Sequence, residues 1–286
     1  MSLPVLANAG AAVSSKATAP MAPVDAIDWK DNTISPVINP MYMEDPVIRS
    51  EIRPIFAYHN ISNDFVTQGG NAQLYALQLR WAITDRLAFI ATQDGYFNID
   101  TGLGVQWDGW MDIAAGFKYA VIDSQEHQFI LTPGFTFSIP LGSEEVFQGK
   151  GDGEFDFFVS AMKGFGNAHL MGNVGLRTPI SGAQSTSLHY SLMADYWVSP
   201  WFIPFVAANG WTVLSEGSSI PLDSEGYDVI NFGSSRAGGV TQMTVGGGFR
   251  SRILSNVFFG AGYEIAVISP EGLTDDRFTF DLSIRF

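Results

Sequence analysis

The carboxyl-terminal stretch, residues 276–286, is the feature of this sequence that most constrains its fold. Apolar residues occupy every second position there, and polar or charged residues fill the positions between them. Because successive side chains of a strand point to opposite faces, this alternation predicts a β-strand with one apolar face and one charged face. The apolar positions are Phe278, Phe280, Leu282, Ile284 and Phe286.

The same period-two alternation recurs from residue 51 onward. Strands of ten to twelve residues are longer than the mean strand of about 5 to 6 residues and match a tilted membrane-spanning strand. A secreted β-sandwich, or two stacked β-domains, is the alternative that alternation alone leaves open. The pattern predicts twelve strands, at 51–61, 72–83, 87–97, 110–121, 128–139, 154–163, 168–178, 187–198, 202–213, 240–250, 257–267 and 276–286.

The connections between these strands alternate between long and short along the whole chain. Tight links are expected at 84–86, 164–167 and 199–201, and the longest connection runs from 214 to 239. Antiparallel barrels of the outer membrane have short turns at the periplasmic end and longer loops outside. The alternation therefore favours an up-and-down barrel.

A carboxyl-terminal strand that ends in Phe, with apolar residues at every second position before it, resembles the assembly signal of bacterial outer-membrane β-barrels. The resemblance covers the strand pattern of residues 51–286. It implies an all-β fold, a transmembrane antiparallel up-and-down β-barrel of about 12 strands, located in the bacterial outer membrane. It also implies outer-membrane lipid, lipopolysaccharide and the barrel-assembly machinery as partners.

Two segments precede the expected barrel. Residues 1–22 are rich in Ala, Ser and Pro, and the small residues Ala7 and Ala9 resemble a signal-peptide cleavage site. We interpret them as a residual export signal or a disordered leader. Residues 23–50 contain four prolines and show no periodicity, which predicts an irregular periplasmic segment or a plug inside the barrel. Residues 51–286 form the barrel itself.

Several classes of structure and site are absent from the sequence. No apolar run approaches the roughly 18 to 20 residues that a membrane helix needs. The chain has no cysteine, so disulfides and thiolate metal sites are excluded. We expect no cofactor and no bound metal in the barrel, and no nucleic-acid partner because basic stripes are missing.

Negative charge gathers in the six long connections, which carry only the bases Lys150 and Arg236. An acidic rim at the extracellular mouth would attract cations and is a possible site for divalent ions. Loop acidity that only keeps the surface solvated is the alternative. The acids are Asp64, Asp100, Asp108, Glu144, Glu145, Asp152, Glu216, Asp223, Glu225, Asp228, Glu271 and Asp275.

The polar positions of the strands, which alternate with the apolar ones, carry charges of both signs. An Arg or Lys facing lipid would cost about 2 to 4 kcal/mol at the bilayer midplane, so we assign this parity to the lumen. The charges either line water or pair across strands in a packed polar interior. The expected pore-lining residues are Arg53, Arg80, Asp94, Asp112, Lys118, Glu154, Asp156, Arg177, Asp195, Arg250, Glu264, Arg277, Asp281 and Arg285.

Four glycines fall on the same inward parity of strands 240–250 and 257–267, namely Gly246, Gly248, Gly260 and Gly262. They predict a patch of lumen wall without side chains. Either a solute path runs along this patch, or the amino-terminal segment packs against it.

The function hypothesis is an outer-membrane channel for passive diffusion or selective uptake of small solutes through a narrow polar lumen. Eight strands leave an interior filled by side chains and 16 to 18 leave an aqueous channel, so twelve suggests a narrow or plugged pore. One alternative is a structural anchor or receptor barrel whose extracellular loops bind a partner protein. The other is a barrel-embedded lipid hydrolase, which we disfavour because His59, His169 and His189 lie on the inward parity. The expectation is that the protein is not an enzyme.

Overall fold

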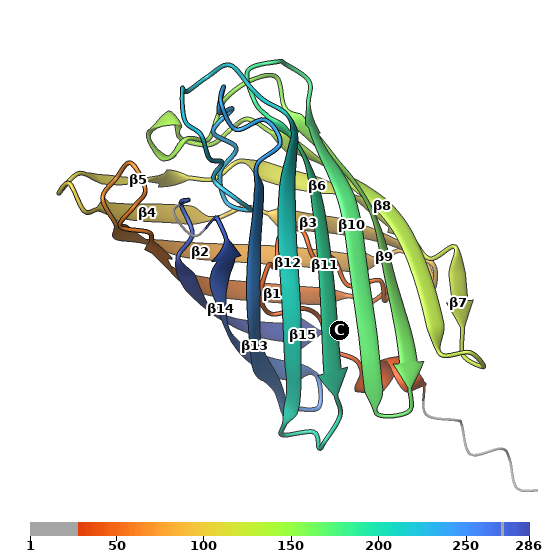
Figure 1. The fold of residues 1–286 in the computed structure, drawn as a ribbon. Coiled ribbons are helices and arrows are strands. Elements are labelled where there is room, and N and C mark those ends of the chain that lie inside the picture. The colour runs from red at the N-terminus through yellow and green to blue at the C-terminus, as the bar shows by residue number, and fades with distance from the viewer. Residues whose placement is uncertain (1–27, 270–271) are drawn as a thin grey trace, which may run out of the picture.

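The computed structural model describes residues 28–269 and 272–286, and its strands form one closed antiparallel barrel (Figure 1). The first strand, β1 (Glu51–Ile61), pairs with β2 (Gly70–Ala82) on one side and with the last strand, β15 (Asp276–Arg285), on the other. This double pairing closes the barrel and leaves no free edge at the join. The predicted export signal at 1–22 lies outside the described residues.

Two of the barrel strands are interrupted. One consists of β3 (Leu87–Gln93) and β4 (Tyr96–Thr101), and the next consists of β5 (Gln106–Trp110), β6 (Ile113–Tyr119) and β7 (Ile122–Ser124). Counting each interrupted strand once reduces the 15 strand segments to twelve.

The seven strands between β7 and β15 are continuous. Those on opposite sides of the barrel cross at a steep angle in Figure 1, as tilted strands of a barrel do. Their bounds are β8 (Phe129–Ile139), β9 (Glu154–Phe165), β10 (Ala168–Pro179), β11 (Thr186–Tyr196), β12 (Ile203–Ser215), β13 (Thr241–Leu254) and β14 (Val257–Ile268).

The all-β, twelve-stranded barrel that the sequence predicted is thus confirmed, and most predicted strands end within four residues of the observed ones. The region from 87 to 121 differs. The predicted connection 98–109 is largely strand, because β4 and β5 form a hairpin whose β4 pairs with β2. Gly95, between β3 and β4, has a φ of 129°, and a Cβ there would lie 2.4 Å from the Tyr75 carbonyl oxygen. A glycine is required at this break.

Apolar side chains cover the outside of the barrel, and charged side chains lie within it. In β15, Phe278 and Phe280 are 43% and 38% exposed, whereas Arg277 and Asp281 are 2% and 3% exposed. This is the reverse of a soluble barrel, and it matches the apolar outer band of barrels that span a membrane. No helix in the described part of the chain is long and apolar enough to cross a membrane.

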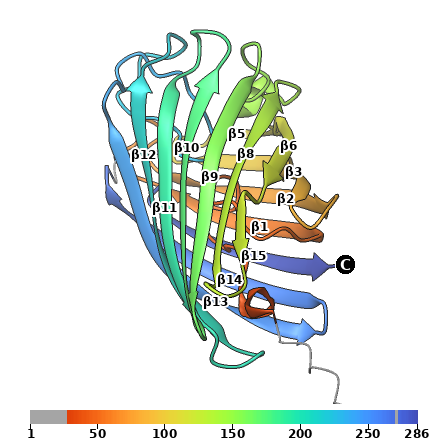
Figure 2. The same cartoon turned by 90° about the vertical axis from the view of Figure 1, so that its right-hand side faces the viewer.

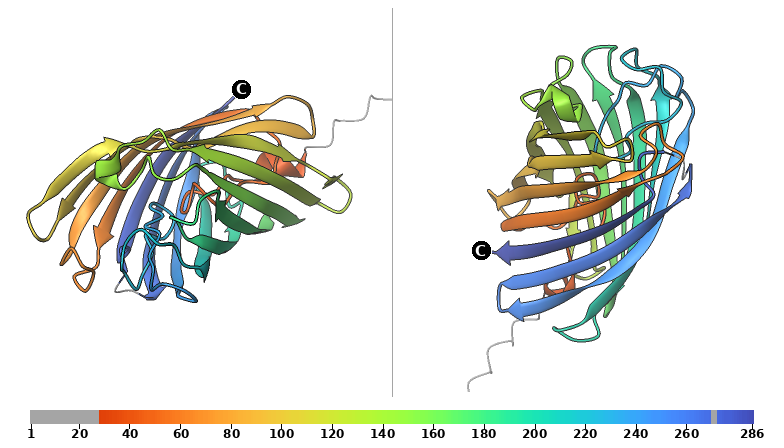
Figure 3. Two further views of the ribbon diagram at one scale, coloured as in Figure 1. Left: turned by 90° about the horizontal axis from the view of Figure 1, so that it is seen from above. Right: turned by 90° about the vertical axis from the view of Figure 1, so that its left-hand side faces the viewer.

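Residues 28–50, called the plug below, enter the barrel from the end that carries the short turns. The plug begins with a 3₁₀ turn, η1 (Trp29–Asn32), which Figure 2 shows at the entrance of the barrel. The Lys30 amide donates to the Asp28 carboxylate, which caps this turn. The chain then runs inside the ring of strands as irregular backbone (Figure 3), and residues 33–47 are all buried. A short second 3₁₀ turn, η2 (Glu144–Val146), lies among the connections at the opposite end.

Candidate functional site

The plug is irregular because its sequence cannot complete a strand ladder. Pro36, Pro40 and Pro46 lack backbone N–H donors, so the plug cannot extend the sheet. Its backbone carbonyls are instead satisfied by side chains of the wall. Gln78 donates to the Pro40 oxygen at 2.9 Å, and Thr132 donates to the Pro46 oxygen at 2.7 Å. Buried backbone oxygens need such partners, so these bonds fix the path of the plug through the lumen.

Glu44 is the residue through which the plug engages the charged wall most strongly. Its carboxylate accepts three hydrogen bonds from Arg80, with Nε at 2.9 Å from Oε1 and 3.2 Å from Oε2, and Nη2 at 2.7 Å from Oε2. Lys118 Nζ donates to the same carboxylate at 2.7 Å. All three side chains are at most 2% exposed. Burial opposes ionisation of Glu44, but Arg80 and Lys118 outweigh it and lower its pKa from 4.5 to about 2.

A second group of wall bases holds the first half of the plug. Arg53 donates to the Pro36 carbonyl oxygen at 2.7 Å, and Arg250 donates to the Ser35 carbonyl oxygen at 3.0 Å. Both guanidinium groups also pair with Asp281 of β15, with Arg250 Nη1 at 2.8 Å from Oδ1. Each arginine therefore links a wall carboxylate to the plug backbone.

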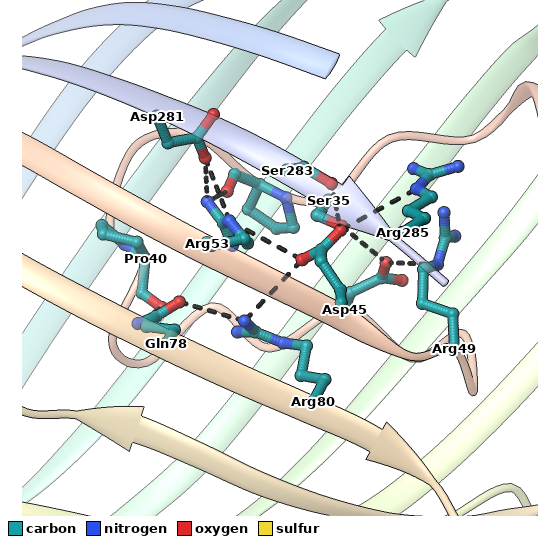
Figure 4. Close-up of polar contacts among 12 residues, drawn as sticks. Ser35, Pro40, Asp45, Arg49, Arg53, Gln78, Arg80, Asp281, Ser283 and Arg285 are labelled. Carbon is teal, nitrogen blue, oxygen red and sulfur yellow. Dashed lines mark hydrogen bonds and ion pairs between the residues drawn. The ribbon is translucent and has the colours of Figure 1, made fainter. Parts of the chain in front are cut away.

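Glu51, at the start of β1, lies between these groups of bases. It accepts a hydrogen bond from Ser35 of the plug at 3.0 Å and another from Ser283 of β15. Its other oxygen lies 3.7 Å from Arg53 and 3.8 Å from Arg80. Figure 4 shows Arg53, Arg80 and Arg285 pointing from the wall toward the plug near Ser35. The wall and the plug thus form one continuous polar network.

The glycine patch is occupied by the plug. A Cβ at Gly260 would lie 2.9 Å from Cγ2 of Val37, and one at Gly262 would lie 2.6 Å from Cγ2 of Ile38. Of the two alternatives that the sequence left open, packing against the amino-terminal segment therefore applies here. Gly246 and Gly248 act differently, because a Cβ on either would lie within 2.3 Å of a carbonyl oxygen of β14. They allow β13 and β14 to curve closely together.

The long loop, residues 216–240, closes the other end of the lumen. Asp228 accepts two hydrogen bonds from Arg277, at 2.9 and 2.7 Å, and Arg277 also pairs with Glu264 of β14 at 2.7 Å. Asn231 donates to Glu154 of β9 at 2.7 Å. Two of the acids expected at an exposed rim, Glu225 and Asp228, are buried instead.

Strands β9 to β11 carry the opposite wall, where acids predominate. Arg177 pairs with Glu154, while Asp156 and Asp195 contact His189 and His169 at 2.7 Å each. The remaining ring nitrogens, His169 Nε2 and His189 Nδ1, have no hydrogen-bond partner among the described residues. Each histidine therefore contacts an acid but no serine nucleophile, which is not the arrangement of a hydrolase triad.

Thirteen of the fourteen predicted pore-lining side chains lie on the inward side, although the lumen around them is filled rather than open. Asp112 accepts backbone hydrogen bonds from Gly142 and Gly149 at 2.8 Å each. Arg285 is partly buried and donates to the Thr33 carbonyl oxygen at 3.2 Å. Arg53, Arg80, Lys118, Glu154, Asp156, Arg177, Asp195, Arg250, Glu264, Arg277 and Asp281 are buried in the contacts described above.

Asp94 is the exception, and its assignment to the lumen is wrong. It lies on the outer face, where its carboxylate accepts a hydrogen bond from the Leu77 amide at 2.8 Å. That amide is free because β2 changes partner there, from β3 at Leu79 to β4 at Tyr75. The break at Asp94 interrupts the alternation of inward-facing and outward-facing residues on which the prediction depended. The carboxylate lines an apolar groove of about 1030 Å³ on the outer wall.

Glu44 and Asp228 are the ion-pairing residues of the candidate site that alternation did not identify. Neither lies in a strand, so no periodicity indicates where its side chain points. For Glu44 the one signal is its position in an apolar, proline-containing segment, between Met43 and Pro46. In the described part of the chain, no three His, Asp or Glu side chains gather closely enough to hold a metal ion.

Comparison with known proteins identifies the fold. No protein-family model matches the sequence, and no curated relative is detected. Among solved structures, the barrel is similar to an outer membrane channel from Pseudomonas putida F1, with 15% identity and a TM-score of 0.57 over 89% of this chain and 100% of that one.

Two further structures show the same architecture. The NanC porin has 7% identity and a TM-score of 0.51, over 83% of this chain and 100% of that chain. The translocator domain of the autotransporter NalP from Neisseria meningitidis has 11% identity and a TM-score of 0.53, over 85% and 90%. At these identities the likeness shows the fold alone. The chain has the fold of the bacterial outer-membrane β-barrels, which is the architecture that its final strand predicted.

Proposed function

We propose that the protein is an outer-membrane channel for small solutes, and that the plug and the long loop close its lumen in the state described here. Its structural neighbours include an outer membrane channel and a porin. The observation that carries the proposal is the chemistry of the plug. A permanently filled core favours apolar packing, because burying charge costs desolvation free energy. Here the plug packs apolar side chains such as Val37 and Ile38 against the wall, but Glu44 and several backbone carbonyls of the plug meet the wall through ion pairs and hydrogen bonds that water can replace.

Lys118 is a wall base whose partners, in the described part of the chain, all belong to the plug. Its ammonium group donates to Glu44, to the Asp45 carbonyl and to the Val47 carbonyl, all of which belong to the plug. No wall carboxylate forms an ion pair with it among the described residues. A lysine that served only to hold the barrel together would pair across strands. Lys118 is instead placed so that its partners leave when the plug leaves, and water then hydrates it.

A reversible disulfide tests whether the plug gates the channel. The chain has no cysteine, so Ile38→Cys with Gly262→Cys introduces one unique pair. A Cβ at Gly262 lies 2.6 Å from Cγ2 of Ile38, close to the roughly 3 Å between Cβ and the partner sulfur in a disulfide. The next neighbours of that Cβ, in Phe205 and Val37, lie at 3.2 and 3.5 Å.

We expect the oxidised variant to be silent in planar bilayers and the reduced variant to conduct. Each single cysteine variant, with and without reductant, serves as the control. Equal conductance of the oxidised and reduced forms would exclude gating by the plug. Absence of conductance in every form would refute the channel proposal itself.

A loop-binding receptor is the second candidate function, and one cavity favours it. An apolar cavity of about 250 Å³ lies among the connections, between Phe65 and Val66 after β1, Trp107 of β5, and Ile220 and Leu222 of the long loop. An apolar hollow of this kind is suited to an inserted side chain of a partner protein. Val66→Asp and Leu222→Asp would abolish such binding and leave conductance unchanged. Unaltered partner binding by both variants would remove this candidate.

A further inference from the structure

We propose that Arg53, Arg80, Lys118 and Arg250, called the basic wall below, form the binding site for the carboxylate of a permeating solute, and that Glu44 occupies this site when the lumen is closed. This inference rests on the proposed channel function and names its solute class. The geometry around Glu44 supports it. Two nitrogens of Arg80 face two oxygens of one carboxylate, and Lys118 binds the same group from β6.

That arrangement is a complete carboxylate receptor. Guanidinium groups bind carboxylates through paired N–H donors, and such charge-assisted bonds are the strongest available to a side chain. The Glu44 side chain reaches the site from the plug, whereas Arg80 and Lys118 belong to β2 and β6 of the wall. When the plug moves, Arg80 and Lys118 therefore remain in the lumen, whereas the Glu44 carboxylate leaves with the plug.

The wall cannot neutralise these bases by itself. The acids that contact the four bases from the wall are Glu51 and Asp281. Four positive charges therefore face two negative ones once Glu44 is gone. Arg53 and Arg250 also lose their carbonyl acceptors on Pro36 and Ser35, which frees one N–H donor on each guanidinium group for a ligand, while each Nη2 keeps its bond to Asp281.

Charges of the other sign lie across the barrel. Strands β9 to β11 carry the buried acids Glu154, Asp156 and Asp195 and the buried base Arg177, whereas Lys163 of β9 makes an exposed contact with the His127 carbonyl. These strands are far from β1 and β15 in the strand order. An open lumen would have a basic side and an acidic side. A small anion would follow the basic side, and an organic carboxylate would place its charged end at Arg80 and Lys118.

The test uses the full-length protein and its Glu44→Gln variant in planar bilayers, with succinate and inorganic phosphate as probes. We expect the reversal potential in a KCl gradient to show preference for chloride, and succinate to block the current in a concentration-dependent manner. Arg80→Gln and Lys118→Gln, each introduced singly, are expected to weaken the block about tenfold. Arg252→Gln is the control, because Arg252 lies near the end of β13 and its guanidinium group binds the Ser255 carbonyl oxygen of the following turn.

The outcomes separate this inference from the channel proposal. A protein that never conducts refutes the channel. A conducting protein that prefers potassium, or whose block by succinate is the same in Arg80→Gln and Lys118→Gln as in the parent, refutes the carboxylate site alone. Block by phosphate without block by succinate assigns the site to phosphate and overturns the solute class. Two independent single variants guard against loss of folding in either one.

Discussion

Replacing Glu44 by Gln should open the channel without unfolding the barrel. In the closed state the substitution leaves Arg80 and Lys118 buried, at 1% and 0% side-chain exposure, without their counter-charge. Removing one partner of a buried ion pair costs about 3 to 5 kcal/mol. With the plug displaced, water reaches both bases, so the cost falls on the closed state alone. Taking about 3 kcal/mol, the ratio of open to closed protein rises roughly 150-fold.

Single-channel recording measures this ratio directly as an open probability. Glu145→Gln is a matched control, because Glu145 is an exposed acid in η2 that makes no contact with the plug. Circular dichroism would establish that both variants retain the barrel. An open probability for Glu44→Gln equal to that of the wild type, in folded protein, would refute the role of this carboxylate in closure.

Three further outcomes follow from the same contacts. Glu44 has a pKa of about 2 in the plug against an ordinary value of 4.5. Its contribution to closure of the lumen is therefore complete above about pH 4.5 and is lost as the pH falls through 2. Conductance measured at pH 5 and at pH 7 should be equal. Gly262→Leu places new atoms where Ile38 packs, which should cost about 1 to 3 kcal/mol and raise the open probability in bilayer recordings. Asp228→Asn removes one of the two carboxylates bound to Arg277, and limited proteolysis should then cleave the long loop faster than in the wild type.

The strands and their facing were predictable because a membrane barrel imposes one rule on every strand. Lipid requires apolar side chains on the outside, so charged residues of the opposite parity must face inward. The predicted strand 51–61 coincides with β1, and Arg53, Arg250 and Asp281 were assigned to the inside from alternation together with the cost of placing a charge in lipid. Closure of the sheet into a barrel follows from the same rule, because the backbone groups of a free strand edge would have no hydrogen-bond partner in lipid.

The positions of the plug and the long loop were not predictable in the same way. Irregular backbone has no period, so the sequence left residues 23–50 either periplasmic or inside the barrel. The contacts that decide the matter are long-range, such as Lys118 with Glu44 and Arg277 with Asp228. The error at Asp94 has a related cause, because a break in a strand changes parity without a marker beyond Gly95.

The plug and the long loop do not close the lumen independently, because they share one apolar cluster and one polar chain. Tyr42 of the plug packs against Trp211 at a ring separation of 4.6 Å, and Trp211 packs against Tyr227 of the loop at 5.8 Å. Arg177 lies 5.4 Å from the Tyr42 ring and pairs with Glu154, which accepts a hydrogen bond from Asn231 of the loop. Displacing the plug exposes the apolar face of the loop to water, so each segment stabilises the other in place. Opening should therefore be cooperative, and the effects of Glu44→Gln and Asp228→Asn on the open probability should depart from additivity.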